Sequence, residues 1–365
     1  MADVATGRPV WALGLMSGTS MDGVDAARIL TDGESIAALP AGEGFALPYP
    51  EPLRAAIAAV EGWAPAAETE TLLDHWHAQA ALALGPSAVV GYHGQTVAHE
   101  PERGRTRQLG DGARLASALG TPVVWDFRSA DMAVGGEGAP LAPFFHWALA
   151  RWIGAKAPVA FLNIGGVANV TWVDPAAEAP EAEGALLAFD TGPGNALVDD
   201  FMRARVGLPL DEDGALAGAG TVRSAVAPSN AASVYLARPG PKSLDRNAFQ
   251  GVRAGVEALS VEDGAATLTA FTADCVAAAL PHLPSPPARW LVCGGGRLNK
   301  TLMGMLAERL DAPVEPVDTV GLDGDMLEAQ AFAYLAVRVL RGLPTSAPGT
   351  TGCRHPVCGG RINQP

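Results

Sequence analysis

The sequence predicts an α/β protein made of two related units, and three observations lead to this fold class. Its 365 residues are enough for two domains of about 150 residues each. Short apolar runs typical of buried strands alternate with helical stretches in both halves of the chain. Residues 158–173 repeat the order of residues 10–30, which is strand, tight glycine turn, strand. This repetition is the evidence for an internal duplication.

In the first half, residues 10–15 and 24–30 are predicted strands joined by the glycine loop of residues 17–23. The loop ends in Asp-Gly, a hairpin signal, so it leads from strand to strand and not into a helix. Residues 34–70 have mixed character and are predicted to be rich in loops. The rest of this half is predicted to form strands at 89–96 and 122–128 and helices at 72–84, 112–119 and 141–153.

The second half is expected to begin after the short segment 154–157, because Pro158 marks a domain boundary there. It is predicted to contain strands on both sides of residues 165–166, strands at 186–190 and 290–293, and helices at 196–206, 265–280, 300–310 and 326–341. The last helix carries apolar residues on more than one side, so it should be largely buried. We therefore expect an N-terminal lobe at 9–154, a C-terminal lobe at 158–342 and a tail at 343–365.

Composition and charge exclude several classes of partner and location. The net charge of −14 argues against nucleic acid or an anionic membrane as the main partner. No apolar stretch reaches the roughly 18 residues of a membrane span, and the N-terminus lacks the basic segment of a secretory signal. Four cysteines in a chain of this length do not make a disulfide framework. We expect a cytoplasmic protein in which backbone N–H groups, a metal and a few cations would hold any anionic ligand.

Three glycine-rich turns follow predicted buried strands, at residues 14–23, 165–166 and 294–296. Because glycine has no side chain in the way, backbone N–H groups in such turns can form an anion-binding nest. The turn at 294–296 opens a predicted helix, whose N-terminus adds positive potential. A purely structural reason is equally open, since glycine is needed wherever a strand turns sharply. No P-loop motif occurs, and residues 294–299 do not fit a dinucleotide-binding G-x-G-x-x-G.

Asp190 is the candidate general base. It ends an apolar strand beside Gly192 and Gly194, so a carboxylate of tuned pKa would have open backbone around it. Its alternative role is to cap the following helix, but Asn195 is better placed for that.

Three other carboxylates have structural as well as functional interpretations. Asp22 and Asp25 either cap their turn or bind a water molecule of a Mg²⁺–phosphate complex. Glu328 lies in the first turn of the last helix, where compensation of the helix dipole is a sufficient reason for an acid.

Two predicted strands end in polar residues, at 93–96 and 126–131, which can donate hydrogen bonds to hydroxyl and carbonyl groups. A loop role and a ligand-binding role are both open for each cluster. Arg128 is favoured for ligand binding, because a cation between two acids of an acidic chain should have a defined geometry. In the tail, Cys353, His355 and Cys358 would need a fourth ligand to hold zinc, and a surface tail is the alternative.

Seven segments of the chain resemble the anhydro-N-acetylmuramic acid kinase family. In the order of the family they are residues 14–25 (GLMSGTSMDGVD), 91–96 (GYHGQT), 126–131 (DFRSAD), 163–169 (NIGGVAN), 189–195 (FDTGPGN), 293–296 (CGGG) and 324–329 (GDMLEA). The resemblance covers about residues 10–352, which is nearly the whole chain.

The resemblance implies a fold of the actin/hexokinase/Hsp70 (ribonuclease H-like) type, in which two related α/β lobes hold ATP in the cleft between them. It implies an enzyme, usually a homodimer, that uses Mg²⁺, ATP and water to open the ring of 1,6-anhydro-N-acetylmuramic acid. The product would be N-acetylmuramic acid 6-phosphate, an amino sugar of peptidoglycan recycling.

The resemblance also assigns roles to individual residues. The first phosphate loop would consist of Gly18, Thr19, Ser20, Met21, Asp22, Gly23, Val24 and Asp25, with Asp22 reaching Mg²⁺ through water. Gly165, Gly166 and Asn169 would form the second loop, and Gly294, Gly295 and Gly296 would approach the nucleotide. Asp190 would deprotonate the attacking water, and the sugar site would be shaped by His93, Gln95, Arg128, Asp131 and Glu328.

The chain departs from the family pattern in two places. Residues 135–140 read GGEGAP where the family has GGQGAP, which adds the carboxylate of Glu137. Residues 241–246 read PKSLDR where the family has PKSTGR. One alternative function is a kinase of another small sugar or carboxylate on the same fold. A second is an ATP-cycling, chaperone-like binding protein, against which stands the lack of a separate peptide-binding domain. A third, an inactive relative, would be expected to lack Asp190.

Overall fold

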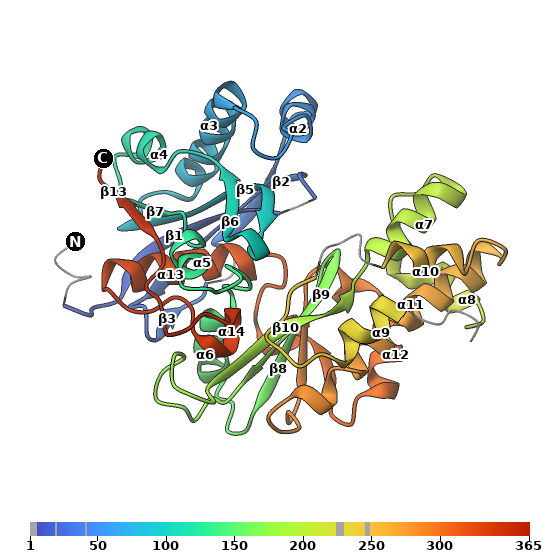
Figure 1. Cartoon of the computed structure of the whole chain (residues 1–365). Helices are drawn as coiled ribbons and strands as arrows, with labels where there is room; N and C mark the ends of the chain where they lie inside the picture. The colour runs from blue at the N-terminus through green and yellow to red at the C-terminus, as the bar shows by residue number, and fades with distance from the viewer. Residues whose placement is uncertain (1–5, 19, 41, 224–229, 245–248) are drawn as a thin grey trace. The chain divides into compact units, whose positions relative to one another are not determined.

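The computed structural model describes residues 6–18, 20–40, 42–223, 230–244 and 249–365 (Figure 1). The chain forms two compact units. Unit 1 contains Met1–Gly154, Glu178–Glu183 and Asp325–Pro365, and unit 2 contains Ala155–Ala177 and Gly184–Gly324. Each unit is built on its own mixed sheet with helices packed against it, which confirms the predicted α/β class.

The sheet of unit 1 has the strand order β13-β7-β5-β1-β2-β3, with β4 beside β2 and β6 beside β5. Its strands are β1 (Val10–Ser17), β2 (Gly23–Thr31), β3 (Ile36–Ala38), β4 (Gly44–Pro48), β5 (Val89–Glu100), β6 (Arg105–Leu109), β7 (Val123–Trp125) and β13 (Arg361–Asn363). Strands β1, β5 and β7 are parallel, whereas β2 runs antiparallel to β1 and β3 antiparallel to β2. Every residue of β1 except Trp11 is buried, because both faces of the sheet are covered.

Helices cover this sheet. They are α2 (Glu51–Ala58), α3 (Ala67–Leu84), α4 (Gly112–Leu119), α5 (Ser129–Ala133), α6 (Pro143–Trp152), α13 (Leu327–Leu340) and α14 (Pro348–Thr351), with the 3₁₀ turn η1 (Pro101–Arg103). The close approach of α13 depends on two glycines in the strands beneath it. A Cβ at Gly14 would lie 1.7 Å from the Ala329 carbonyl oxygen, and one at Gly91 would lie 2.0 Å from that of Phe332. No other residue fits at these two positions.

The C-terminal part of the chain belongs to unit 1, which differs from the predicted division into lobes of 9–154 and 158–342 with a tail at 343–365. Helix α13 lies against β1, β2 and β5 (Figure 1). Its apolar side chains are buried there. The supposed tail is ordered, and its strand β13 pairs antiparallel with β7. Linear order along the chain cannot reveal such a return, because only packing against the first sheet fixes it.

The sheet of unit 2 has the order β10-β9-β8-β11-β12. Its strands are β8 (Val159–Ile164), β9 (Val167–Val173), β10 (Leu186–Pro193), β11 (Trp290–Cys293) and β12 (Val314–Pro316). Pairs β8–β9 and β9–β10 are antiparallel, and pairs β8–β11 and β11–β12 are parallel. This arrangement matches β3-β2-β1-β5-β7 of unit 1 strand for strand. The predicted internal duplication is therefore present in the topology.

The helices of unit 2 are α7 (Ala196–Val206), α8 (Ala215–Ala219), α9 (Asn230–Ala237), α10 (Gln250–Ala254), α11 (Val261–Ala277) and α12 (Lys300–Arg309), with the 3₁₀ turns η2 (Glu212–Gly214), η3 (Leu280–His282), η4 (Gly295–Leu298) and η5 (Val317–Val320). The helical stretch at residues 261–282 is long and apolar enough to cross a membrane. However, 72% of its 18-residue apolar window is buried inside the protein. This stretch, mostly α11, is a core helix of unit 2 and gives only weak evidence for a membrane span.

Each strand and helix predicted from the sequence has a counterpart in the structure, although their ends differ by a few residues. Several short elements were not predicted, namely α5, α8, α9, α10, α14, β6, β12 and β13. Residues 34–70, predicted to be rich in loops, contain β3, β4, α2 and the start of α3. The edge strands β3 and β4 are only three and five residues long, and neither shows a clean alternation of buried and exposed positions. A period-2 pattern cannot be recognised over so few residues.

Candidate active site

The loop between β1 and β2 in unit 1 has a strained turn at its centre. The Met21 N–H donates to the Gly18 carbonyl at 3.1 Å, and Met21 has a φ of +56°, which is rare for a side chain of its size. Ser20 and Asp22 are exposed, and the Ser20 hydroxyl donates to Asp22 Oδ1 at 2.7 Å. A Cβ at Gly18 would meet nothing closer than Ser20 Oγ at 3.4 Å. Predicted residue Thr19 lies outside the described residues.

Gln95 lies beneath this loop and not at its surface. Its side chain is fully buried, its Nε2 donates to the Gly18 carbonyl at 3.1 Å, and its Oε1 accepts from the Ser17 hydroxyl at 2.5 Å. The Tyr49 hydroxyl donates in turn to Ser17 Oγ at 2.8 Å. The contacts of Gln95 therefore hold the first loop in place, and the structure gives this residue a supporting position where the sequence predicts a sugar-binding one.

His93 and Arg128 form the central contact of the predicted sugar site. The Arg128 guanidinium donates through Nη2 to His93 Nε2 at 2.8 Å and through Nη1 to the Gly138 carbonyl at 2.7 Å. His93 Nδ1 lies 2.7 Å from the Gly94 carbonyl, which can only accept, so the ring is neutral with its proton on Nδ1. Burial and the neighbouring Arg128 lower the pKa of His93 well below its usual value, which agrees with this tautomer.

Arg128 forms no ion pair with any residue that the structure describes, although Glu328 and Asp131 attract it from a longer distance. Burial lowers the pKa of Arg128 to about 10 against the attraction of these two acids. The Glu328 side chain reaches solvent. Desolvation by the surrounding protein raises the pKa of its carboxyl, whereas the charge of Arg128 lowers this pKa. A half-buried guanidinium held only by neutral partners is suited to an anionic or polar ligand.

Asp131, in α5, is completely buried, and its carboxylate is surrounded by hydrogen-bond donors of the protein. It accepts hydrogen bonds from the hydroxyls of Ser346 and Thr351 at 2.5 and 2.6 Å and from the Gly138 N–H at 2.8 Å. Asp131 was predicted to shape the sugar site, and the structure places its carboxylate between its own loop and the C-terminal segment.

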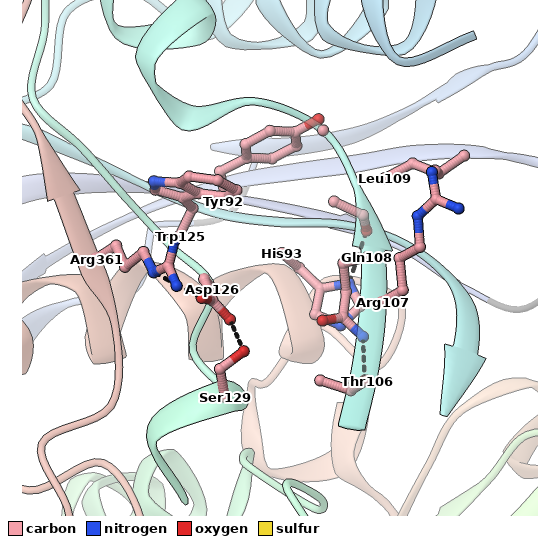
Figure 2. A pocket seen from close by; sticks show the side chains of 12 residues that line it. Tyr92, His93, Thr106, Arg107, Gln108, Leu109, Trp125, Asp126, Ser129 and Arg361 are labelled. Atoms are coloured by element: carbon pink, nitrogen blue, oxygen red, sulfur yellow. Dashed lines mark hydrogen bonds and ion pairs between the residues drawn. The ribbon is translucent and has the colours of Figure 1, made fainter. Parts of the chain in front are cut away.

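A cavity of about 170 Å³ opens beside His93, between β6 and the segment that follows β7 (Figure 2). Its charged groups are already paired. Asp126 bonds Ser129 at 2.5 Å and Arg361 at 2.9 Å, and Arg107 contacts Glu70 at 3.3 Å. Figure 2 shows the Asp126–Ser129 pair on one wall and Gln108 on the opposite wall. The cavity therefore extends the His93 region without a charged group that needs a ligand.

In unit 2, the glycine turn between β8 and β9 is tied to the start of α7. The carbonyl of Gly165 accepts from the Asn195 N–H at 2.7 Å, and that of Gly166 accepts from the Gly194 N–H at 3.0 Å. A Cβ at Gly194 would lie 2.2 Å from the Gly165 oxygen, so this contact requires glycine. The Asn195 side chain does not cap α7 as predicted. Its Nδ2 donates to the Ile164 carbonyl at 3.4 Å instead.

The turn at Gly294–Gly296 packs against the end of β8. Gly294 has a φ of +70°, and a Cβ there would lie 2.4 Å from Asn163 Oδ1. A Cβ at Gly295 would touch only Asn195 Nδ2, at 3.6 Å. The turn was predicted to open the helix that follows, but it continues as the short 3₁₀ turn η4. Helix α12 begins five residues after Gly295, with its own cap at Asn299. The positive potential of a helix N-terminus is therefore not delivered by this turn.

Asp190 is held by both backbone and side-chain contacts. Its N–H donates to the Lys242 carbonyl at 3.0 Å, its carbonyl accepts from the Tyr235 hydroxyl at 2.8 Å, and its Oδ2 accepts from the Leu244 N–H at 2.8 Å. The Lys242 ammonium is buried and donates to the carbonyls of Tyr235 and Arg238 at 2.9 and 2.7 Å. Burial lowers the pKa of Lys242 to about 8, and the Asp190 carboxylate opposes this shift.

A polar row crosses the sheet of unit 2 beside this carboxylate. Asp190 pairs in register with Asn169, Asn169 with Asn163, and Asn163 with Cys293. Cross-strand partners in an antiparallel pair lie on the same face, so Asp190, Asn169 and Asn163 share one face. Asn163 was not among the predicted site residues, although its position two residues before Gly165 was a usable signal.

Comparison with known proteins gives consistent matches. A family model described as "Anhydro-N-acetylmuramic acid kinase" matches residues 10–365. The chain is 54% identical over 361 residues to anhydro-N-acetylmuramic acid kinase 1 of Jannaschia sp. (strain CCS1), covering 98% of this chain and 96% of that protein. It is 56% identical over 363 residues to the anhydro-N-acetylmuramic acid kinase of Cereibacter sphaeroides, with 98% and 97% covered. A solved ROK family glucokinase from Streptomyces griseus, in complex with glucose and AMPPNP, aligns with 14% identity and a TM-score of 0.43, over 89% of this chain and 99% of that one.

Proposed function

Because the chain belongs to the anhydro-N-acetylmuramic acid kinase family, we propose that it transfers the γ-phosphoryl group of ATP to 1,6-anhydro-N-acetylmuramic acid while water opens the anhydro ring. The observation that carries this proposal is the family match over residues 10–365, together with relatives that share more than half of their residues with this chain. The product is N-acetylmuramic acid 6-phosphate, an intermediate of peptidoglycan recycling.

Asp190 is the proposed general base. It takes a proton from water, and the water oxygen bonds to the anomeric carbon of the sugar. The bond between that carbon and the bridging oxygen breaks, and the bridging oxygen, still attached to C6, accepts the γ-phosphoryl group as ADP leaves. The contacts that hold Asp190 support this role, because a base must be kept at a fixed position relative to its proton donor.

The nucleotide is proposed to bind through backbone N–H groups of the loop at residues 18–25 and of the turns at Gly165–Gly166 and Gly294–Gly296. Phosphoryl transfer depends mainly on positioning and on charge stabilisation, which such loops and a cation supply. Among the described residues, no group of three or more His, Cys, Asp or Glu side chains is arranged to hold a metal. This fits Mg²⁺ carried by the phosphates, to which the exposed Asp22 carboxylate contributes through water.

The sugar is proposed to bind at Arg128 and Glu328. Anhydro-N-acetylmuramic acid carries a carboxylate on its lactyl group, and Arg128 is a cation without an ion pair among the described residues. His93 uses both ring nitrogens for Gly94 and Arg128, so its part is to orient the guanidinium.

Product analysis tests this function. The protein is incubated with Mg²⁺, ATP and 1,6-anhydro-N-acetylmuramic acid, and the sugar is followed by ³¹P and ¹³C NMR. We expect a phosphate coupled to C6 together with the free anomeric carbon signals of an opened ring. In a parallel reaction, 1,6-anhydro-N-acetylglucosamine, which lacks the lactyl carboxylate, should react far more slowly. ATP turnover without a phosphorylated sugar would favour a binding protein, and faster reaction of a different sugar would favour another kinase.

We also propose that the enzyme acts in the cytoplasm as a homodimer. Its four cysteines form no disulfide, which agrees with a reducing compartment. The family resemblance is the basis for the dimer, and sedimentation velocity of the purified protein tests it.

A further inference from the structure

A buried carboxylate, that of Asp131, joins the C-terminal segment of unit 1 to the loop that follows α5. Oδ1 accepts the hydroxyls of Ser346 and Thr351, and Oδ2 accepts the Gly138 N–H. A Cβ at Gly136 would lie 2.1 Å from Oδ2, so the loop can close around this carboxylate only with glycine there. Two segments far apart in the sequence, the loop around Gly136–Gly138 and the C-terminal residues 346–351, are thus fixed to one side chain.

Gly138 connects Asp131 to Arg128, because it bonds to both side chains. Its N–H is bound by Asp131, and its own carbonyl accepts from Arg128 Nη1 at 2.7 Å. The Glu137 N–H beside it donates to the Thr351 carbonyl at 2.8 Å, so the C-terminal segment contacts the same loop a second time. The loop can move away from Arg128 only if these bonds break together.

The chemistry of the contact makes it rigid. A fully buried carboxylate is costly unless its oxygens are satisfied by hydrogen bonds, and bonds to a charged acceptor are stronger than those between neutral groups. Among the described residues Asp131 has no ion pair, so neutral donors, chiefly the Ser346 and Thr351 hydroxyls and the Gly138 N–H, carry this stabilisation. Its negative charge also attracts the Arg128 guanidinium, which fixes the arginine from a second direction.

We propose that Asp131 is a positioning residue for Arg128, and that residues 346–351 take part in sugar binding through it. The proposal rests on the proposed function for the role of Arg128 in holding the sugar. The linkage runs from Ser346 and Thr351 through Asp131 and Gly138 to the guanidinium, and His93 fixes the other side of that group. No residue of the C-terminal segment needs to touch the substrate.

Thr351→Val tests the linkage with little change in shape, because it removes one hydroxyl donor. We expect the KM for the anhydro sugar to rise about 10-fold and the KM for ATP to stay within about twofold, since one charge-assisted hydrogen bond is lost. Thr345→Val is the matched control. Its hydroxyl is equally buried and accepts the Gly359 N–H at 2.8 Å, but it has no contact with Asp131. Equal effects of both substitutions on the sugar KM would overturn the proposal.

A double-mutant cycle separates positioning from general destabilisation. Lysine at position 128 keeps the charge but cannot contact Gly138 and His93 together. In the Arg128→Lys background, Thr351→Val should therefore change the sugar KM by less than about twofold. The same 10-fold loss in both backgrounds would contradict the linkage.

Hydrogen exchange gives a readout that does not depend on the substrate. Asp131→Asn keeps an oxygen for Ser346 and Thr351 but turns an amide NH₂ toward the Gly138 N–H. We expect faster exchange in a peptide covering residues 134–140 in this variant and in Thr351→Val, but not in Thr345→Val. If wild-type protein fails to phosphorylate the sugar, the proposed function has failed, whereas unchanged exchange in both test variants refutes the linkage itself.

Discussion

Asp190→Asn is the substitution that separates proton transfer from every other task of the site. Asparagine has the shape of aspartate, and the contacts with Lys242 and Tyr235 are made by the backbone of residue 190. The hydrogen bond from the Leu244 N–H at 2.8 Å can be accepted by the amide oxygen. Since these contacts keep residue 190 in place, the main loss expected in the variant is the capacity of the side chain to accept a proton.

The magnitude follows from what a positioned base contributes. General base catalysis is worth about 10²–10⁴-fold, so kcat should fall by that factor, which corresponds to about 3–5 kcal/mol in activation free energy. The dissociation constants of ATP and of the anhydro sugar should change by less than about threefold, because no binding contact is removed.

A coupled assay of ADP release measures kcat, and isothermal titration calorimetry measures both dissociation constants. Asp311→Asn is the control, because it removes an exposed carboxylate of the same unit without a role in the site. A kcat for Asp190→Asn within about 10-fold of the wild type would show that another group takes the proton.

Three further predictions concern the first loop, Lys242 and a buried histidine. Gly18→Val should weaken ATP binding while the protein stays folded, because a Cβ at residue 18 would meet only Ser20 but would fill the space above the loop. Fluorescence titration with a labelled nucleotide measures the affinity. Unchanged affinity would contradict the assignment of this loop to the nucleotide. Lys242→Met removes a cation that attracts the Asp190 carboxylate, so the acidic limb of the kcat–pH profile should move to higher pH; a profile that only scales down would mean a structural role alone. Burial lowers the pKa of His77 from 6.5 to about 4. Between these pH values the unfolded chain binds a proton at this residue and the folded protein does not. The free energy of unfolding therefore decreases as the pH falls from 6.5 toward 4. Urea unfolding measures the free energy of unfolding at pH 4 and pH 7, and the decrease between them should be about 3 kcal/mol smaller in His77→Gln than in the wild type. The same decrease in both proteins would show that His77 does not cause the pH dependence.

The sequence predicted local features of the chain, such as turns that follow buried strands, but not the contacts that depend on packing. The glycine turns at Gly165–Gly166 and Gly294–Gly296 follow buried strands, and that order is visible in the pattern of apolar and glycine residues. The positions of Gln95 and Asp131 were less accessible. Both are polar residues near strand ends, and nothing in the sequence distinguishes a buried carboxylate bonded to its own loops from one that faces a ligand.

The helix α13 illustrates the same limit at the level of the fold. Its apolar residues on more than one side predicted burial, which is confirmed, but not the sheet against which it is buried. The sheet is identified by Gly14 and Gly91, two strand glycines that leave room for α13 because they have no side chain. Each is unremarkable in its own strand, and only the three-dimensional contact shows that they serve the same helix.

The distinction between backbone and side-chain contacts also explains which departures from the family pattern this site tolerates. Leu244 stands where the family has threonine, yet its contact with Asp190 is made by the main-chain N–H, which every residue except proline provides. The contact of Lys242 with Asp190 likewise uses its carbonyl. The identity of residue 244 is therefore free to vary, whereas Asp190 is not if its carboxylate is the proposed proton acceptor. Variation at positions 243–244 should thus leave the base in place as long as the loop keeps its backbone course.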